Sequence, residues 1–374
     1  MQRQTVVSTS ITRPIGDMDN AGDVGDMADK NRVIKPSGIT PYRAPWWLGG
    51  RQDDSGNRFG AHAQTVYPSL FGTRLQVAYT RERWDTTPHG KPDGDFIDVD
   101  RLTSTATHQQ RPMLVVFHGL EGSSQGIYAL NLMREAEQRG WRGLVPHFRG
   151  CGGEMNRLPR AYHSGDAPEI EWILRRAKAE APDQPLYVAA ISLGGNATMK
   201  WLGDAGSEAS PIVTAAAAIS APLDLMSAGA ALERGFCKIY TKNFLRTMKK
   251  NALAKLAKHP GIFREDVVRV ASTLREFDNE VTAPLHGYRD TDDYWTRGSA
   301  KPGLIDVRVP SLLLNARNDP FLPASALPQP SQVSTAIHCD FPEQGGHVGF
   351  VSGSFPGNSS WMARRVFHFF EHGD

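Results

Sequence analysis

The sequence predicts an α/β fold with a mostly parallel central sheet and helices on both faces. Short apolar runs alternate with helical patterns along most of the chain, which is the order strand, helix, strand. Such alternation is typical of parallel sheets that helices cover on both sides. The chain has 374 residues, of which 40% are hydrophobic and 22% charged, so it can bury a large core.

The expected elements follow one another in order. Strand-like runs are "LQVAYT", "MLVVFHG", "WRGLVPHFRG", "LYVAAIS" and "PIVTAAAAIS", and the helical patterns between them lie at residues 127–140, 167–181 and 196–205. The acidic segment "DGDFIDVD" at residues 93–100 suggests calcium binding at first, but its acids miss the spacing of an EF-hand calcium loop. We therefore expect an edge strand here. Ligands of such sheets bind beyond the carboxyl ends of the strands, so the residues that follow each run are the candidates for a site.

The chain is expected to form one domain, residues 36–374, after a mobile segment at residues 1–35 that is polar and rich in Gly and Asp. About ninety residues separate "AAAAIS" from "SLLLN". A connection of that length needs structure of its own. We therefore expect a mainly helical cap insertion at about residues 222–306.

Charge and cysteine content limit the partners. The formal net charge of +2 argues against a general nucleic-acid binder. Three cysteines lie far apart without metal-like spacing, so we expect neither a disulfide framework nor a metal site. We find no apolar stretch of the length that a secretory signal or a membrane span needs, and this predicts a cytoplasmic protein.

Three strand ends carry the residue types of nucleophilic catalysis. Ser192 ends the run "LYVAAIS" on a predicted sharp turn into a helix, where the residues two positions away must be small, and they are Ala190 and Gly194. A serine hydroxyl is a weak nucleophile, so it needs a base and the base needs an orienting acid. Asp319 follows "SLLLN" and His347 lies in "EQGGHVGF", which gives the chain order Ser, Asp, His.

Each of these residues also has a simpler interpretation. A serine can begin a helix by chance, Asp319 before Pro320 can open a turn, and His347 can be a loop histidine. Their joint order favours catalysis. If either partner were misassigned, Asp278 and His286 would be the next candidates, and Cys151 is a weaker candidate nucleophile.

These segments resemble the α/β-hydrolases, and more narrowly the YheT-like branch that also holds the mammalian ABHD1/2/3-type proteins. The similarity runs from about Pro45 to the C-terminus and is carried by "HGLEGSSQGIYALNL", "GWRGLVPHFRGCGGEMNRLPRAYHSGD", "ISLGGNATMKWLG", "NARNDPFLP" and "GGHVGF", with a weaker echo in "AHAQTVYPSLF". The family pattern Gly-Phe-Ser-Leu-Gly-Gly-Asn begins with Ala190 here. The resemblance implies an esterase or lipase without a cofactor, in which Ser192 is the nucleophile, Asp319 the orienting acid and His347 the general base.

Acyl transfer also needs donors for the negative charge that develops on the carbonyl oxygen. The residue after the nucleophile, Leu193, is expected to supply one backbone N–H, and Leu120 in "HGLEG" the other. His118 is expected to brace this loop.

The predicted cap has two features. Its residues Phe236, Phe244, Leu245 and Met248 are expected to line an acyl pocket. Its segment "CKIYTKNFLRTMKKNALAKLAKHP" holds six Lys, one Arg and no acid, which predicts either a solvated face or a surface that contacts anionic lipid or an acidic partner.

The sequence as a whole predicts a serine hydrolase for small-molecule carboxylic esters, either short- to medium-chain acyl esters or acylglycerols, acting through an acyl-enzyme. Two alternatives remain at this point. One is an acyltransferase with the same three residues, and the other is a binding protein with this fold and no activity.

Overall fold

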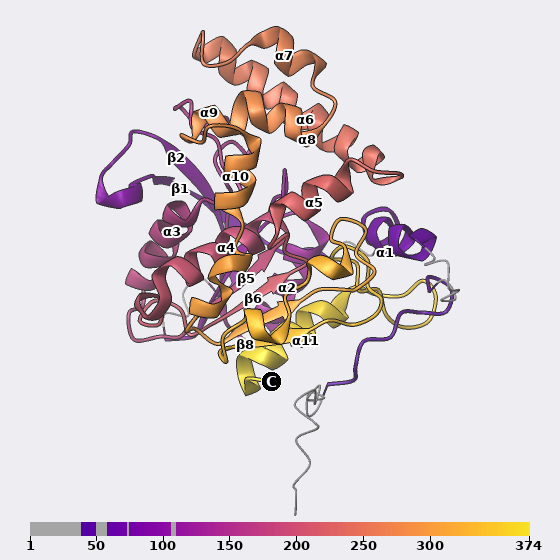
Figure 1. Ribbon diagram of the computed structural model, residues 1–374. Coiled ribbons are helices and arrows are strands. Elements are labelled where there is room, and N and C mark those ends of the chain that lie inside the picture. The colour runs from indigo at the N-terminus through magenta and orange to yellow at the C-terminus, as the bar shows by residue number, and fades with distance from the viewer. Residues whose placement is uncertain (1–38, 50–57, 73–74, 106–109) are drawn as a thin grey trace, which may run out of the picture. The chain divides into compact units, whose positions relative to one another are not determined.

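The centre of the molecule is a twisted sheet, seen in a computed structural model that describes residues 39–49, 58–72, 75–105 and 110–374 (Figure 1). The predicted mobile segment 1–35 lies outside the described residues. Within them the sheet has eight strands in the order β1-β2-β4-β3-β5-β6-β7-β8. The strands are β1 (Tyr79–Asp85), β2 (Phe96–Leu102), β3 (Met113–Phe117), β4 (Arg142–Pro146), β5 (Leu186–Ile191), β6 (Ala215–Ile219), β7 (Ser311–Leu314) and β8 (Ile337–Asp340).

The mostly parallel sheet predicted from the sequence is confirmed. The strands from β3 to β8 pair in parallel, while β1 and β2 join the sheet in antiparallel pairings. Parallel strands need crossover connections, and helices provide most of them here.

Helices cover both faces of the sheet, as expected. Along β5, Val188 and Ala190 pack in a core with α3 (Ala167–Ala179) and α4 (Leu193–Ala205), whereas Ala189 and Ile191 point to the other face. That second face is covered by α2 (Ile127–Gln138) and α11 (Ser360–His372). Because successive side chains point to opposite sides of a strand, burial on both sides explains why the strand runs are apolar throughout.

The prediction of an edge strand at residues 93–100 is wrong. Within the described sheet, β2 lies between β1 and β4, and β1 forms the edge. The acidic residues of β2 suggested exposure to solvent, but β1 supplies a cation opposite each of two of them. Arg81 pairs with Asp100 at 2.7 Å and Arg83 with Asp98 at 2.8 Å, so these carboxylates are buried with a partner.

The chain between β6 and β7 is mainly helical and has a hydrophobic core of its own. Its helices are α5 (Leu225–Leu232), α6 (Cys237–Lys258), α7 (Glu265–Val270), α8 (Leu274–Phe277), α9 (Ala283–Leu285) and α10 (Thr291–Gly298). Buried residues of this core include Leu245, Val268, Phe277 and Trp295. In Figure 1 helices α6 to α9 gather at one end of the sheet, and α11 lies at the other. We call the segment from α5 to α10 the cap.

The remaining elements are short, apart from helix α1 (Arg58–Phe71). None of the helices in the described part of the chain is long and apolar enough to cross a membrane. Short 3-10 helices lie at Pro88–Gly90, Thr103–Thr105, Gly206–Ala209, Lys301–Asp306, Ala324–Ala326 and Pro330–Gln332, and a π-helical turn spans Asp278–Thr282.

Candidate active site

Ser192 lies on a sharp turn between β5 and α4, with a positive φ of 51°. The turn leaves little room for side chains around it. A Cβ added to Gly194 would lie 2.6 Å from the carbonyl oxygen of His118, and one added to Gly195 would lie 2.8 Å from Cβ of Ala221. Ala190, where the family pattern has glycine, is fully buried, so the sheet accommodates its methyl group.

The three residues expected to act together lie within hydrogen-bonding distance of one another. His347 Nε2 is 3.1 Å from Ser192 Oγ, and His347 Nδ1 is 2.8 Å from Asp319 Oδ2. Because a carboxylate only accepts hydrogen bonds, Nδ1–H donates to Asp319 and Nε2 is free to accept the serine proton. The side chain of Asp319 has no exposed surface and that of His347 is 10% exposed, so little water competes for these bonds.

Contacts from other segments hold this arrangement. The second carboxylate oxygen of Asp319 accepts the backbone N–H of Phe321 at 2.8 Å. The backbone N–H of His347 donates to Thr65 Oγ1 at 2.9 Å, and the ring of Phe321 lies 4.3 Å from the imidazole between centroids. The sequence did not indicate these roles of Thr65 and Phe321, although Thr65 belongs to "AHAQTVYPSLF", the segment with weaker similarity to the family.

The loop after β3 approaches Ser192 closely and presents free backbone donors. A Cβ on Gly119 would lie 3.2 Å from Cβ of Ser192. The N–H of Gly119 donates to the hydroxyl of Tyr128 at 3.3 Å, and the N–H of Glu121 to the hydroxyl of Tyr162 at 2.9 Å. The intervening N–H of Leu120 has no such partner among the described residues, and neither has that of Leu193. Leu120 and Leu193 therefore keep the two donors that an oxyanion site requires.

His118 fastens this loop to the neighbouring strand end. Its Nε2 accepts the backbone N–H of Phe148 at 3.1 Å, so the proton sits on Nδ1, which donates to the carbonyl oxygen of Gly119 at 2.8 Å. Complete burial lowers the pKa of His118 to about 3 and keeps the ring neutral. The expected bracing role agrees with these contacts.

Glu121 connects the same loop to the cap. One carboxylate oxygen accepts the hydroxyl of Tyr162 at 2.8 Å and the other accepts Nδ2 of Asn251, on α6, at 3.0 Å. Burial raises the pKa of Glu121. Its own backbone N–H bonds the same tyrosine hydroxyl, so side chain and backbone are held together next to Leu120.

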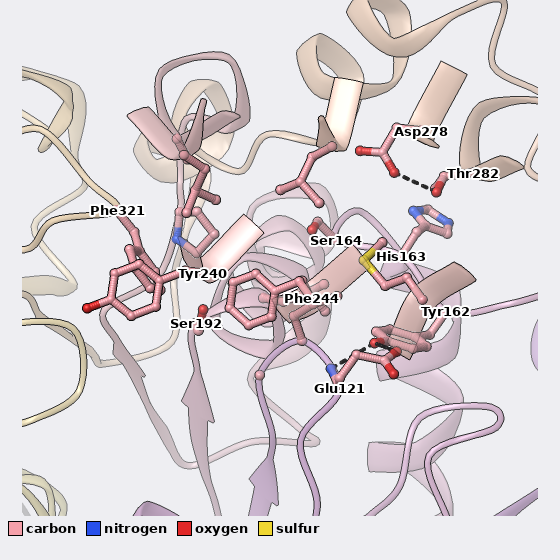
Figure 2. Close-up of a pocket in the computed structure, with 18 of the residues that line it drawn as sticks. Glu121, Tyr162, His163, Ser164, Ser192, Tyr240, Phe244, Asp278, Thr282 and Phe321 are labelled. Carbon is pink, nitrogen blue, oxygen red and sulfur yellow. Dashed lines mark hydrogen bonds between the residues drawn. The ribbon is translucent and has the colours of Figure 1, made fainter. Parts of the chain in front are cut away.

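Ser192, His347, Leu120 and Leu193 open into one cavity of about 540 Å³ between the strand ends and the cap. Its walls are mostly apolar, and those from the cap include Leu225, Leu232, Phe244, Met248, Phe263, Phe277, Val281 and Trp295. Figure 2 shows Ser192 at the end of its strand, with Phe244, Tyr240 and Phe321 among the side chains of this cavity.

The expected acyl-pocket residues divide into two groups. Phe244 and Met248 line the cavity. Leu245 does not, because it faces the interior of the cap, and Phe236 is 54% exposed at the start of α6. The prediction is therefore wrong for Leu245 and Phe236. Leu245 and Met248 are three residues apart on this helix, and the sequence does not show which of them contacts the cavity.

The alternative pair Asp278 and His286 belongs to the cap. Asp278 accepts the hydroxyl of Thr282 at 2.6 Å and the indole N–H of Trp295 at 2.9 Å, and Figure 2 shows it well away from Ser192. The imidazole of His286 lies 4.2 Å from that of His163 between centroids. Burial raises the pKa of Asp278 to about 6 and lowers that of His286. Neither has a hydrogen bond to Ser192 or His347.

Cys151, the weaker candidate nucleophile, belongs to a loop that buried ion pairs hold in place. Burial raises the pKa of the Cys151 thiol, which argues against a thiolate nucleophile. Arg149 beside it forms buried ion pairs with Asp95 at 2.9 Å and Glu169 at 2.8 Å, which hold the loop to β2 and α3. Across the described residues, no group of three or more His, Cys, Asp or Glu side chains is placed to hold a metal ion.

Comparison with known proteins shows the family of this chain. The family described as the alpha/beta hydrolase fold matches residues 112–354. The chain belongs to the α/β-hydrolase family. Within it, this α/β-hydrolase is 39% identical over 307 residues to the putative esterase YheT of Escherichia coli (strain K12), covering 82% of this chain and 88% of the other. It is 30% identical over 306 residues to the human phospholipase ABHD3, covering 80% and 74%.

A more distant relative is the monoacylglycerol lipase of Saccharomyces cerevisiae, 26% identical over 223 residues, covering 57% of this α/β-hydrolase and 49% of the lipase. The resemblance drawn from the motifs is thereby confirmed, both for the family and for the branch with YheT and ABHD3.

Proposed function

We propose that this α/β-hydrolase cleaves carboxylic esters through Ser192, His347 and Asp319. The observation that carries the proposal is the continuous hydrogen-bond chain from Asp319 Oδ2 through His347 to Ser192 Oγ, opening into an apolar cavity. Relatives named esterase, phospholipase and monoacylglycerol lipase support an ester substrate. The proposed substrates are short- to medium-chain acyl esters or acylglycerols.

The first half of the reaction forms an acyl-enzyme. Ser192 Oγ attacks the ester carbonyl carbon while His347 Nε2 takes the hydroxyl proton, and Asp319 stabilises the imidazolium that results. The carbonyl oxygen becomes an oxyanion, which the N–H groups of Leu120 and Leu193 can bind. Collapse of this intermediate breaks the ester C–O bond, and His347 gives its proton to the leaving alcohol oxygen.

The second half regenerates the enzyme. His347 Nε2 takes a proton from a water molecule, whose oxygen attacks the acyl carbon on Ser192. The second tetrahedral intermediate releases the carboxylic acid, and Ser192 Oγ recovers its proton from His347. All proton transfers use one imidazole, and we propose that no metal or cofactor takes part.

The cap supports a preference for acyl chains. Phe244 and Met248 project into the cavity from α6, with Leu225 and Leu232 from α5 on the same cavity wall. Each methylene that such a wall removes from water contributes about 0.8 kcal/mol of binding. We expect kcat/KM for p-nitrophenyl esters to rise with acyl length and to level off when the cavity is full.

The proposal is tested by steady-state kinetics on purified variants. Ser192→Ala removes the attacking oxygen and little volume, so hydrolysis of p-nitrophenyl butyrate should fall by about four orders of magnitude or more while the fold persists. His347→Ala should fall comparably, and Asp319→Asn should fall sharply because the imidazole loses its orientation. Ser207→Ala, at an exposed position outside the site, provides a control that should keep full activity. Wild-type rates in the Ser192→Ala enzyme would contradict the proposal.

Three finer points are proposals. Transfer of the acyl group to an alcohol or thiol would use the same residues, and product analysis with competing acceptors separates it from hydrolysis. EDTA should leave the rate unchanged. The cytoplasmic location expected from the sequence stays a prediction.

A further inference from the structure

A group of exposed apolar side chains lies on one part of the surface. Trp46 is 89% exposed, Leu70 and Phe71 at the end of α1 are 67% and 66% exposed, and Phe355 is 75% exposed. Large apolar side chains in solvent are ordinary when scattered, but a contiguous group marks a contact surface.

Ring contacts join the three segments that carry these side chains. Trp47 lies 4.9 Å from Tyr67 and 5.4 Å from Phe355 between centroids, and Tyr67 lies 5.1 Å from Phe71. The four rings therefore link the segment before α1, the C-terminal turn of α1 and the loop that precedes α11.

The patch continues onto the cap through His62. The imidazole of His62, on α1, lies 4.6 Å from the ring of Phe236 and 3.2 Å from the hydroxyl of Tyr240. Phe236 and Ile239 are 54% and 57% exposed at the start of α6. We call this surface the mouth face, made of Trp46, Leu70, Phe71, Phe236, Ile239 and Phe355.

Leu70, Phe71 and Ile239 of the mouth face border the opening of the cavity. Two of the residues that line the cavity are exposed to solvent, Ser69 on α1 and Asn243 on α6. Ser69 precedes Leu70 and Phe71, and Asn243 lies one turn after Ile239. The cavity therefore opens between α1 and α6.

The exposed side of α6 carries positive charge next to these apolar residues. Lys238, Lys242, Arg246 and Lys250 are exposed and spaced four residues apart, and none of them forms an ion pair with a described residue. Side chains three or four residues apart on a helix are neighbours, so these like charges repel one another. Ile239 lies on the same side, three residues before Lys242.

The charge is local to α6. The described helices α7 and α10 of the cap carry acidic residues in their first turns, while α6 has none along its length. The whole protein has a net charge of only +2. An anionic lipid bilayer has negative headgroups at its surface and apolar chains below them. A row of unpaired cations beside exposed apolar side chains is complementary to such a surface.

We infer that the mouth face docks on anionic lipid bilayers. Leu70, Phe71, Phe236 and Ile239 insert among the headgroups, and the basic residues of α6 pair with lipid phosphates. Docking brings the opening between α1 and α6 against the bilayer, so that a lipid ester passes from the membrane to Ser192. That last step rests on the proposed function, whereas the docking does not.

The test measures binding of the full-length Ser192→Ala protein to sedimented vesicles of phosphatidylcholine with and without phosphatidylglycerol. This variant cannot consume the lipid under the proposed mechanism. We expect binding to the vesicles with phosphatidylglycerol and a loss of binding as salt rises. Hydrolysis of p-nitrophenyl acetate by the wild-type protein, measured without vesicles, reports on the proposed function separately.

Substitutions locate the surface. Each Lys or Arg near an anionic membrane contributes about fivefold in partitioning, so Lys238→Ala, Lys242→Ala and Arg246→Ala together should weaken binding roughly a hundredfold. A control with the same change in charge replaces the exposed Lys91, Arg111 and Arg308 by Ala and should bind as before.

A second pair tests insertion. Phe236→Ser with Ile239→Ser should weaken vesicle binding, whereas Ile305→Ser, at an exposed site outside the mouth face, should not. Absence of binding to phosphatidylglycerol vesicles would overturn the inference. Equal losses in the α6 triple variant and its control would overturn it too, as would full binding by the Phe236 and Ile239 variant. Unchanged vesicle binding by the triple variant would also overturn the inference, and it would point to an acidic protein as the partner of the basic row of α6.

Discussion

Asp278 is a buried carboxylate in the cap, and its replacement by asparagine should make stability less dependent on pH. Its carboxyl group accepts the hydroxyl of Thr282 and the indole N–H of Trp295. An asparagine has nearly the same shape. Its oxygen can accept from Trp295, and its amide N–H can donate to the hydroxyl of Thr282, which also acts as an acceptor.

The size of the effect follows from the pKa of Asp278, which burial raises from 3.8 to about 6. The folded protein binds this proton more tightly than the unfolded chain does. The free energy of unfolding is therefore lowest at a pH where Asp278 is ionised in both states. As pH rises through 4 to 6, the wild-type protein loses stability, up to about 3 kcal/mol in total. Asparagine does not ionise and escapes this loss.

Urea unfolding at two pH values measures the difference. Relative to the wild type, Asp278→Asn should gain about 1.5 kcal/mol more in unfolding free energy at pH 8 than at pH 5. Comparing the two pH values removes any constant effect of the altered hydrogen bonds. Asp183→Asn, at an exposed position, is the control. Its unfolding free energy should differ from that of the wild type by the same amount at both pH values. A difference for Asp278→Asn that stays constant or shrinks as pH rises would refute the reasoning.

Three further predictions concern the site. Met248→Trp should move the preferred p-nitrophenyl ester to shorter acyl chains, because Met248 lines the cavity; equal losses for all lengths would contradict this. Tyr162→Phe removes the hydroxyl that bonds the backbone and the side chain of Glu121, so kcat should fall about tenfold to a hundredfold with little change in KM. A change confined to KM would oppose a role in holding the loop. Gly194→Ala would bring a methyl group within 2.6 Å of the carbonyl oxygen of His118, so both activity and the melting temperature should fall, and unchanged values in a thermal melt and an ester assay would disprove the crowding.

The sheet was predictable because burial on both sides leaves a strong pattern. Runs such as "MLVVF" and "AAAAI" are apolar at every position, and β3 and β6 lie in the interior of the sheet. The acidic run at β2 misled the prediction, since the arginines that compensate it lie on β1. A sequence pattern records which side chains are charged, but not which ones are brought opposite each other.

Bringing Ser192, Asp319 and His347 together was also predictable, because parallel strands end at one edge of a sheet. The contacts that orient them were not. Thr65 holds the backbone of His347 across 282 positions of sequence, and Asn251 reaches Glu121 across 130. Such contacts depend on how α1 and α6 pack, and no local pattern encodes that.

The cap shows the same limit within one helix. Leu245 and Met248 are three residues apart on α6, a spacing that makes two side chains neighbours on a helix. In the structure Met248 lines the cavity and Leu245 packs inside the cap. Apolar periodicity predicts burial, but the neighbour that buries a side chain depends on tertiary packing.

Covalent labelling of the nucleophile tests the central claim most directly. The wild-type protein would be treated with a fluorophosphonate, digested and mapped by mass spectrometry, with residual hydrolysis of p-nitrophenyl butyrate measured in parallel. We expect one adduct per chain, on Ser192, activity that falls in proportion to labelling, and no adduct in Ser192→Ala. An adduct on another residue, or full esterase activity in a protein labelled completely at Ser192, would contradict the account.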